Sequence, residues 1–226
     1  MGFIINSSRF AVVATDSYTT DFSSNDGWVG TGTYSYNAAG YLSMTHGTGA
    51  IVIDLEDADV FGTGNLLSNT KNYFEFAFDI KGESGADNEQ MNGFSSANQT
   101  ADRNTSQAWF GCSSLIGYGV SPAANGMYVE STASGAVSVA GQGLLAAYNW
   151  STGNFRIKIR RLSATTCSVQ IWNEAGDTKL GDSGTHTILS GEGNNLKYCK
   201  FLTYPAASSA YTIEVPDLII RNGVSE

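Results

Sequence analysis

The feature that most constrains the fold of this chain is a strict alternation of apolar and polar side chains in two stretches, NYFEFAFDIKG (72–82) and NFRIKIRRL (154–162). A period of two with one apolar face indicates a half-buried β-strand, and no long segment shows the 3.6-residue period of an amphipathic helix. The residues predicted to face inward are Phe74, Phe76, Phe78, Ile80, Phe155, Ile157 and Ile159. The residues predicted to face outward on the second strand are Arg156, Lys158 and Arg160. We therefore expect an all-β protein.

The remaining segments fit short strands joined by turns. CSVQIWN continues the pattern with Cys167, Val169 and Ile171 inward, and SATT joins it to the preceding strand as a hairpin. Weaker strands are predicted in GWVGTGTYSY, GYLSMTH, GAIVIDL, AWFGC, GMYVEST, GAVSVA and KYCKFLTY, and a last strand in DLIIRNG. The polar segment 82–106 is predicted to be a long loop with one short strand around Phe94.

Composition supports this fold class. The 226 residues include 26 glycines, 3 prolines and only 15% charged residues, which is typical of many short strands and tight turns. No repeat or Pro/Ser-rich linker divides the chain. We expect one two-sheet antiparallel jelly-roll sandwich over residues 16–226, preceded by an N-terminal strand or arm at residues 1–15.

The charge of the chain limits its partners. Twelve basic residues against 21 acidic ones give a net charge of −9. Nucleic acids and anionic membranes both bind cationic surfaces, so we expect neither as a partner. The first residues lack the basic and long apolar regions of a signal peptide, and we expect synthesis in the cytosol.

The three cysteines, Cys112, Cys167 and Cys199, leave at least one thiol unpaired. Their spacing does not suggest a zinc site. Cys167 alternates with inward apolar residues and is predicted to be a small core residue. A disulfide between Cys167 and Cys199 remains open as an alternative.

The order of the segments resembles the concanavalin A-like lectin and glucanase superfamily, which includes L-type lectins and laminin-G-like domains. The resemblance runs over roughly residues 18–222 and is carried by TDFSSNDGW, YFEFAFDIKG with MNGFSSAN, GYGVSPAANGMYVEST, FRIKIRRLSATTCSVQIWNEAG and IEVPDLIIRNG. It implies a concanavalin A-like sandwich.

The resemblance also bears on metal binding. L-type lectins hold a metal pair on a Val-Glu-x-Asp strand; Glu130 matches the Glu, but Thr132 replaces the Asp. A neutral hydroxyl is a weak ligand for hard cations, so we expect no metal there and no resident cofactor. Related jelly rolls contain a structural calcium ion, which here would lie between Asp21 and Asp217.

Candidate catalytic residues do not form a recognisable set. Asp54 and Glu56 would share a strand face, as the nucleophile and acid of glycosidases do, but their spacing departs from the family pattern Glu-x-Asp-x-x-Glu. His46 and His186 lie in Gly/Thr-rich stretches without a GxSxG motif. We expect a protein without enzymatic activity.

Four aromatic residues are candidates for stacking against a sugar: Trp28, Trp109, Trp150 and Trp172. Trp172 is out of phase with the inward residues of its strand, so it is expected on the outer face of the sheet. An outward Trp either contacts a partner or glycan, or covers the second face of its own sheet. Both alternatives stay open.

The opening MGFIINSSRFAVV carries Phe3, Ile4, Ile5 and Phe10 as candidate contact residues. It resembles the openings of tailed-phage structural proteins that lead into a concanavalin A-like domain. Such a strand-prone segment either pairs within its own sandwich or adds to the sheet edge of a neighbour.

The resemblance implies a non-enzymatic virion structural protein, a capsid decoration or head/tail-associated subunit. It would be located in the virion and bind other virion proteins, as a homo-oligomer or in a capsid lattice. The alternative is a carbohydrate-binding lectin-like module, and the third hypothesis is a glycoside hydrolase or polysaccharide lyase.

Deleting residues 1–13 tests the role of the opening segment. At about 25 cal/mol per Å2 of buried apolar surface, such an arm contributes several kcal/mol to association before ordering costs are subtracted. We expect the truncated protein to stay folded and to lose assembly in light scattering. A lowered melting temperature would identify an internal strand instead, and unchanged mass and particle incorporation would exclude an interface role.

Overall fold

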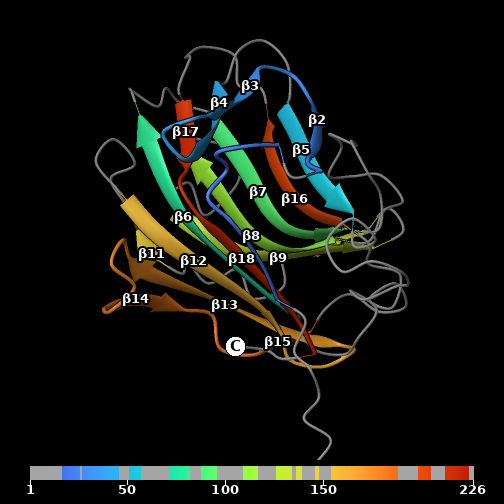
Figure 1. Ribbon diagram of the computed structural model, residues 1–226. Helices are drawn as coiled ribbons and strands as arrows, with labels where there is room; N and C mark the ends of the chain where they lie inside the picture. The colour runs from blue at the N-terminus through green and yellow to red at the C-terminus, as the bar shows by residue number, and fades with distance from the viewer. Residues whose placement is uncertain are drawn as a thin grey trace, which may run out of the picture.

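The computed structural model describes residues 17–25, 27–45, 51–56, 72–81, 88–95, 109–116, 126–133, 136–138, 146–147, 154–187, 198–204 and 212–223. Every regular element in these ranges is a β-strand, and the strands form two antiparallel sheets stacked as a sandwich (Figure 1). The predicted all-β jelly-roll sandwich is therefore confirmed. The described ranges contain no helix with the length and apolar character needed to cross a membrane.

One sheet has ten described strands, seven of them in the order β14–β13–β12–β6–β17–β4–β3. Their bounds are β14 (Lys179–Asp182), β13 (Thr166–Asn173), β12 (Asn154–Arg161), β6 (Asn72–Lys81), β17 (Thr212–Val215), β4 (Tyr41–Thr45) and β3 (Tyr34–Asn37). The other three are β18 (Leu218–Asn222), which pairs with β6 and with β1 (Ser17–Thr20), and β15 (His186–Thr187), which pairs with β13. β6 therefore pairs with β12, β17 and β18 and lies at the centre of this sheet.

The facing sheet has eight described strands, seven of them in the order β10–β9–β8–β7–β16–β5–β2. Their bounds are β10 (Ala136–Ser138), β9 (Gly126–Ala133), β8 (Trp109–Ile116), β7 (Asn88–Ser95), β16 (Tyr198–Tyr204), β5 (Ile51–Glu56) and β2 (Val29–Thr31). The eighth strand, β11 (Ala146–Ala147), pairs with β9.

Three predicted segments fold differently from expectation. GWVGTGTYSY forms two strands in different sheets, β2 and β3, and Gly32 between them has a φ of 91°, which favours glycine. The predicted loop 82–106 contains the eight-residue strand β7, which pairs along its length with β8 and β16. Backbone hydrogen bonds to these two neighbours therefore stabilise a strand whose sequence is mostly polar. KLGD, for which no strand is predicted from the sequence, forms the edge strand β14.

An aromatic cluster joins the two sheets. Phe74 of β6 contacts Phe94 of β7 and Phe201 of β16, with ring centroids 5.7 and 5.5 Å apart. Trp28 lies 5.5 Å from Phe201, and its indole N–H donates to the Tyr18 hydroxyl at 3.3 Å. Trp28 is fully buried, which excludes it as a platform for a sugar.

The inward residues predicted on two neighbouring strands complete this core. Phe155, Ile157 and Ile159 of β12 are buried, as are Cys167, Val169 and Ile171 of β13. The predicted outward residues of β12 are half-buried, which confirms the alternation on this strand.

Cys167 and Cys199 lie in facing sheets, and both are free thiols. The disulfide alternative is therefore not formed. Burial raises the pKa of the Cys167 thiol to about 12, so it stays protonated at neutral pH. The side chain of Cys112 lies outside the described residues.

Candidate functional site

The outer face of the ten-stranded sheet gathers charged side chains around the middle of β6. The strand register places Arg156 opposite Ala77 on one side and Trp172 on the other. Lys158 lies opposite Glu75 in the same way. Diagonal neighbours across paired strands also interact, and the contacts here are diagonal ones: Arg156 reaches Glu75, and Lys158 reaches Trp172.

Arg156 is the centre of an ion-pair network on this face. Its Nη1 and Nη2 donate to Asp217 Oδ1 and Oδ2 at 3.1 and 2.7 Å, a bidentate pairing. Nη1 also donates to Glu75 Oε1 at 3.1 Å, and the Tyr73 hydroxyl donates to the other oxygen of Glu75. The backbone N–H of Ala77 donates to Asp217 Oδ1 at 3.2 Å.

The network is sheltered from water. The Arg156 side chain is 17% exposed and that of Glu75 is 11% exposed, whereas Asp217 is 43% exposed. Desolvation lowers the pKa of Arg156, but the hydrogen bonds and charges of Asp217 and Glu75 outweigh it and raise the pKa above its ordinary value. The guanidinium therefore stays charged and fixes both carboxylates in place.

The turn after β13 closes over Arg156. Gly176 has a φ of 75°, and a Cβ at this position would lie 3.1 Å from Arg156 Cδ. A side chain there would be strained by its backbone and would press on the arginine stem. The turn thus requires glycine because it packs directly on Arg156.

Trp172 lies on the outer face, as predicted from its phase, and is half-buried. The Lys158 ammonium lies 4.5 Å from the centroid of its ring, and its indole N–H donates to Gln170 Oε1 at 3.2 Å. One ring face is therefore covered by a cation. These contacts give Trp172 a role in covering its own sheet; a contact with a partner or glycan stays a prediction.

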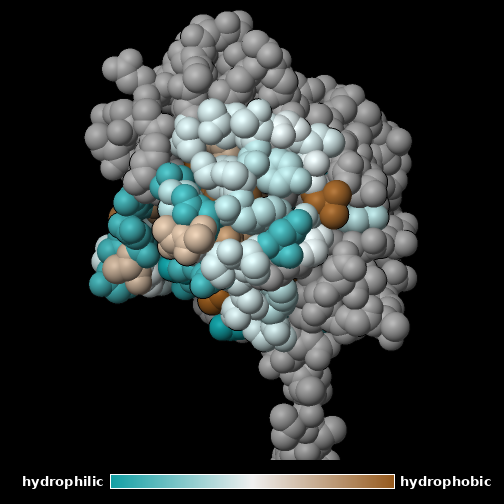
Figure 2. Space-filling model, turned by 45° about the horizontal axis from the view of Figure 1, so that its top comes forward, coloured by the Kyte–Doolittle hydropathy of each residue, from teal (hydrophilic) through white to brown (hydrophobic). Residues whose placement is uncertain are grey.

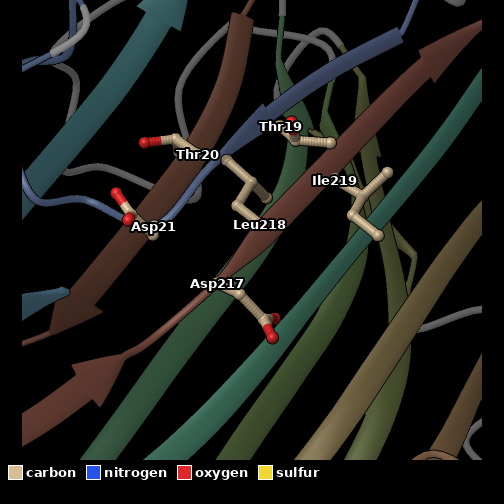
Figure 3. A pocket seen from close by; sticks show the side chains of 6 residues that line it. All are labelled: Thr19, Thr20, Asp21, Asp217, Leu218 and Ile219. Atoms are coloured by element: carbon tan, nitrogen blue, oxygen red, sulfur yellow. The ribbon is translucent and has the colours of Figure 1, made fainter.

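A hollow of about 510 Å3 lies where β1 ends and β18 begins. Its walls are formed by Thr19, Thr20, Asp21, Asp217, Leu218 and Ile219 (Figure 3). In Figure 3, Asp217 and Ile219 extend to the right, and Thr20 and Asp21 extend to the left. Thr20 and Leu218 are buried, whereas Thr19 is exposed and Ile219 is half-buried on the outer face.

This geometry bears on the structural calcium ion that related jelly rolls would place between Asp21 and Asp217, the alternative to the expected absence of a cofactor. Both residues line the hollow, but their carboxylates diverge, and Asp217 is already held by Arg156 (Figure 3). Asp21 Oδ1 accepts the backbone N–H of Ser23 at 3.0 Å, which lowers the pKa of Asp21. Within the described ranges, no three His, Cys, Asp or Glu side chains come together to hold a metal. The two aspartates thus lie close together in the fold but do not converge as ligands.

The described surface is polar rather than apolar. Figure 2 shows mainly pale and teal surface over the described residues, with small separate brown areas. Among these residues, the large apolar side chains that are exposed are Val29 at 50% and Leu180 at 44%, on strands at the ends of the two sheet orders. A surface of this kind suits a ligand that forms hydrogen bonds.

Comparison with known proteins identifies the structural class of this two-sheet fold. Neither a protein-family model nor a curated protein sequence matches the chain. Among solved structures, peanut lectin with a 9-residue peptide superposes with a TM-score of 0.59 at 13% identity, over 92% of this chain and 97% of that one. Lectin I from Ulex europaeus, in complex with a methyl fucoside, gives 0.56 at 10% identity, over 92% and 97%. The chain has the concanavalin A-like fold.

A third structure of this concanavalin A-like fold comes from a virus. The CBM2 module of the evolved Dit protein of Lactobacillus casei BL23 phage J-1 superposes with a TM-score of 0.53 at 12% identity. The match covers 92% of this chain and 97% of the module. At such identities the likeness concerns the fold, and the lectins named above share it.

The remaining sequence candidates fall in different places. Several candidates lie outside the described residues: Phe3, Ile4, Ile5, Phe10, His46, Trp150 and the side chain of Trp109. Position 130 of β9 lies opposite Gly111 of β8, and position 132 lies opposite Trp109. Position 54 of β5 lies opposite Lys200, a lysine that is 1% exposed. A ring nitrogen of His186 lies within hydrogen-bond distance of the Ser183 carbonyl.

Sequence reasoning missed the joining of Glu75, Arg156 and Asp217. Their outward phase could be predicted from alternation, but their meeting depends on which strands pair and in which register. Asp217 follows Pro216 between β17 and β18, and this break in the strand is the one local signal of an unusual position.

Replacing Arg156 by Met tests the network, because Met keeps an apolar stem and removes the guanidinium. Glu75 would remain almost buried without its cation, so we expect the free energy of unfolding to fall by about 2 kcal/mol, less than for a fully buried pair because Asp217 is exposed. Urea unfolding followed by tryptophan fluorescence measures the loss.

Lys179→Met is the matched control, because Lys179 pairs with Asp182 on the same sheet but is 44% exposed. We expect this variant to change stability by less than about 0.5 kcal/mol. Equal losses in the two variants, or no loss in Arg156→Met, would contradict a structural role for the network.

Proposed function

We propose that this chain is a non-enzymatic carbohydrate-binding module. The observation that carries the proposal is the superposition on lectins over 92% of the chain, at TM-scores of 0.56 to 0.59. The phage module that shares the fold is named as a CBM2 module, which favours the same function. Of the hypotheses drawn from the sequence, the comparisons therefore favour the lectin-like module over the structural virion protein.

The absence of a matching catalytic pattern in the sequence supports binding without turnover. Asp54 and Glu56 do not follow the Glu-x-Asp-x-x-Glu spacing. In the strand register, position 54 of β5 lies opposite the buried Lys200 and position 56 lies opposite Tyr198.

A glycan array tests the proposal with the full chain in buffers that contain calcium or EDTA. We expect binding in both buffers, because Thr132 supplies a neutral hydroxyl where lectins of this fold have a carboxylate ligand. The bound glycans, incubated with the protein, should release no reducing ends or unsaturated products. Failure to bind any glycan at high protein concentration in either buffer would reject the proposal, and product release would replace it with an enzyme.

A second candidate function is that of a virion structural protein, a capsid decoration or head/tail-associated subunit. The likeness to the phage module, which is covered over 97% of its length, supports it. The two functions are compatible, because a glycan-binding module carried on a virion does both. The partners would then be other virion proteins, a second copy of this chain or a capsid lattice.

Mass spectrometry of purified particles tests the virion role. We expect this chain in particles at a stoichiometry that does not fall when the particles are washed at high salt, because an apolar arm is not screened as surface charges are. Absence from particles that contain the other structural proteins would exclude the virion role and leave the carbohydrate-binding proposal untouched.

A further inference from the structure

We propose that the hollow at the junction of β1 and β18 binds a neutral sugar, with Asp217 as the acceptor of its hydroxyl hydrogen bonds. This inference rests on the proposed carbohydrate-binding function and deepens it by naming a site and a ligand class. The hollow measures about 510 Å3, within the size range typical of small-molecule sites. It lies beside the Arg156 network, because Asp217 lines it and is held by Arg156.

Asp217 is prepared for this role by its neighbours. A carboxylate offers about four acceptor positions. On Asp217, three acceptor positions are taken by the donors Arg156 Nη1, Arg156 Nη2 and the backbone N–H of Ala77. Two of these donors bind Oδ1, and only Arg156 Nη2 binds Oδ2. The Asp217 side chain is 43% exposed, so part of it is accessible to a ligand. Arg156 is a positioning residue, since it holds the acceptor still before a ligand arrives and so reduces the ordering cost of binding.

The remaining walls complete a surface suited to a sugar. Thr19 is exposed, and its hydroxyl both donates and accepts hydrogen bonds. Ile219 lies opposite Thr19 in the register and is half-buried, so it presents an apolar surface to the carbon-bound hydrogens of a ring. An acceptor, a hydroxyl and an aliphatic group side by side match the alternating polar and apolar surface of a hexose.

Charge decides between neutral and acidic sugars. None of the six lining residues is a cation, and two of them are aspartates. The Arg156 guanidinium is occupied by Asp217 and Glu75, and the whole chain carries a net charge of −9. A uronate or sulfated sugar would meet like charge in the hollow, and so the ligand class is a neutral hexose or its neutral oligomers.

The test compares wild-type protein with variants on an array of neutral glycans and their uronate or sulfated counterparts. Asp217→Asn removes the charged acceptor, and Thr19→Arg fills the hollow from an exposed position. Asp182→Asn is the matched control, because it also removes an ion-paired carboxylate from the same sheet, on the edge strand β14. A thermal melt of each variant verifies folding; if Asp217→Asn fails to fold, Thr19→Arg carries the test.

We expect wild type to prefer neutral glycans, and Asp217→Asn and Thr19→Arg to lose at least about tenfold in affinity, since a hydrogen bond to a charged group is worth roughly that. Asp182→Asn should bind as wild type does. Unchanged binding by both hollow variants would overturn the site and leave the carbohydrate-binding function intact. A further variant, Trp172→Ala, is measured alongside them, and a loss of binding confined to it would have the same meaning. Binding of acidic glycans alone would overturn the ligand class. If wild type binds no glycan at all, the proposed function falls and the inference falls with it.

Discussion

The contact of Phe74 with Phe94 and Phe201 is the interaction on which the rest of this sandwich depends. Phe74 lies on β6, which pairs with three other strands, and its two aromatic partners lie on neighbouring strands of the facing sheet. Burial of these rings stabilises the packing of the two sheets, because apolar surface is removed from water on both sides at once. The outer face can carry charge only because this inner face holds β6 in place.

The described outward side chains of β6 are buried almost as fully as its inward Phe74. Tyr73 is 2% exposed and Ala77 is 3% exposed, although both have the outward phase. Long side chains from the flanking strands cover them: the Arg221 guanidinium lies 5.3 Å from the centroid of the Tyr73 ring, and Arg156 bridges to Glu75. Arginine stems thus act as an outer covering for the sheet, and Glu75 and Asp217 neutralise the charge of Arg156.

A second buried polar group lies at the other end of β12. Arg161 has the inward phase of its strand and is fully buried, with donors to the carbonyls of Ser163 and Ala164. Desolvation lowers its pKa. Its Nη1 reaches Asn72 at 3.4 Å, and Asn72 in turn donates to Asn222 at 2.9 Å. These bonds satisfy a cation inside the sandwich where β12 and β18 end beside the start of β6.

The sequence by itself determined the fold class and the inward faces of β12 and β13, because alternation is local and each inward residue follows from its neighbours two positions away. It also indicated the outward position of Trp172. It could not decide that Trp172 lies against Lys158, that β7 is a full strand within a polar segment, or that Asp21 and Asp217 line one hollow with diverging carboxylates. These features depend on strand order and register between segments far apart in the chain, such as β1 with β18. Pairing between distant segments is decided by the packing of the whole core, so only the tertiary structure brings Arg156 to Asp217 and forms the candidate site.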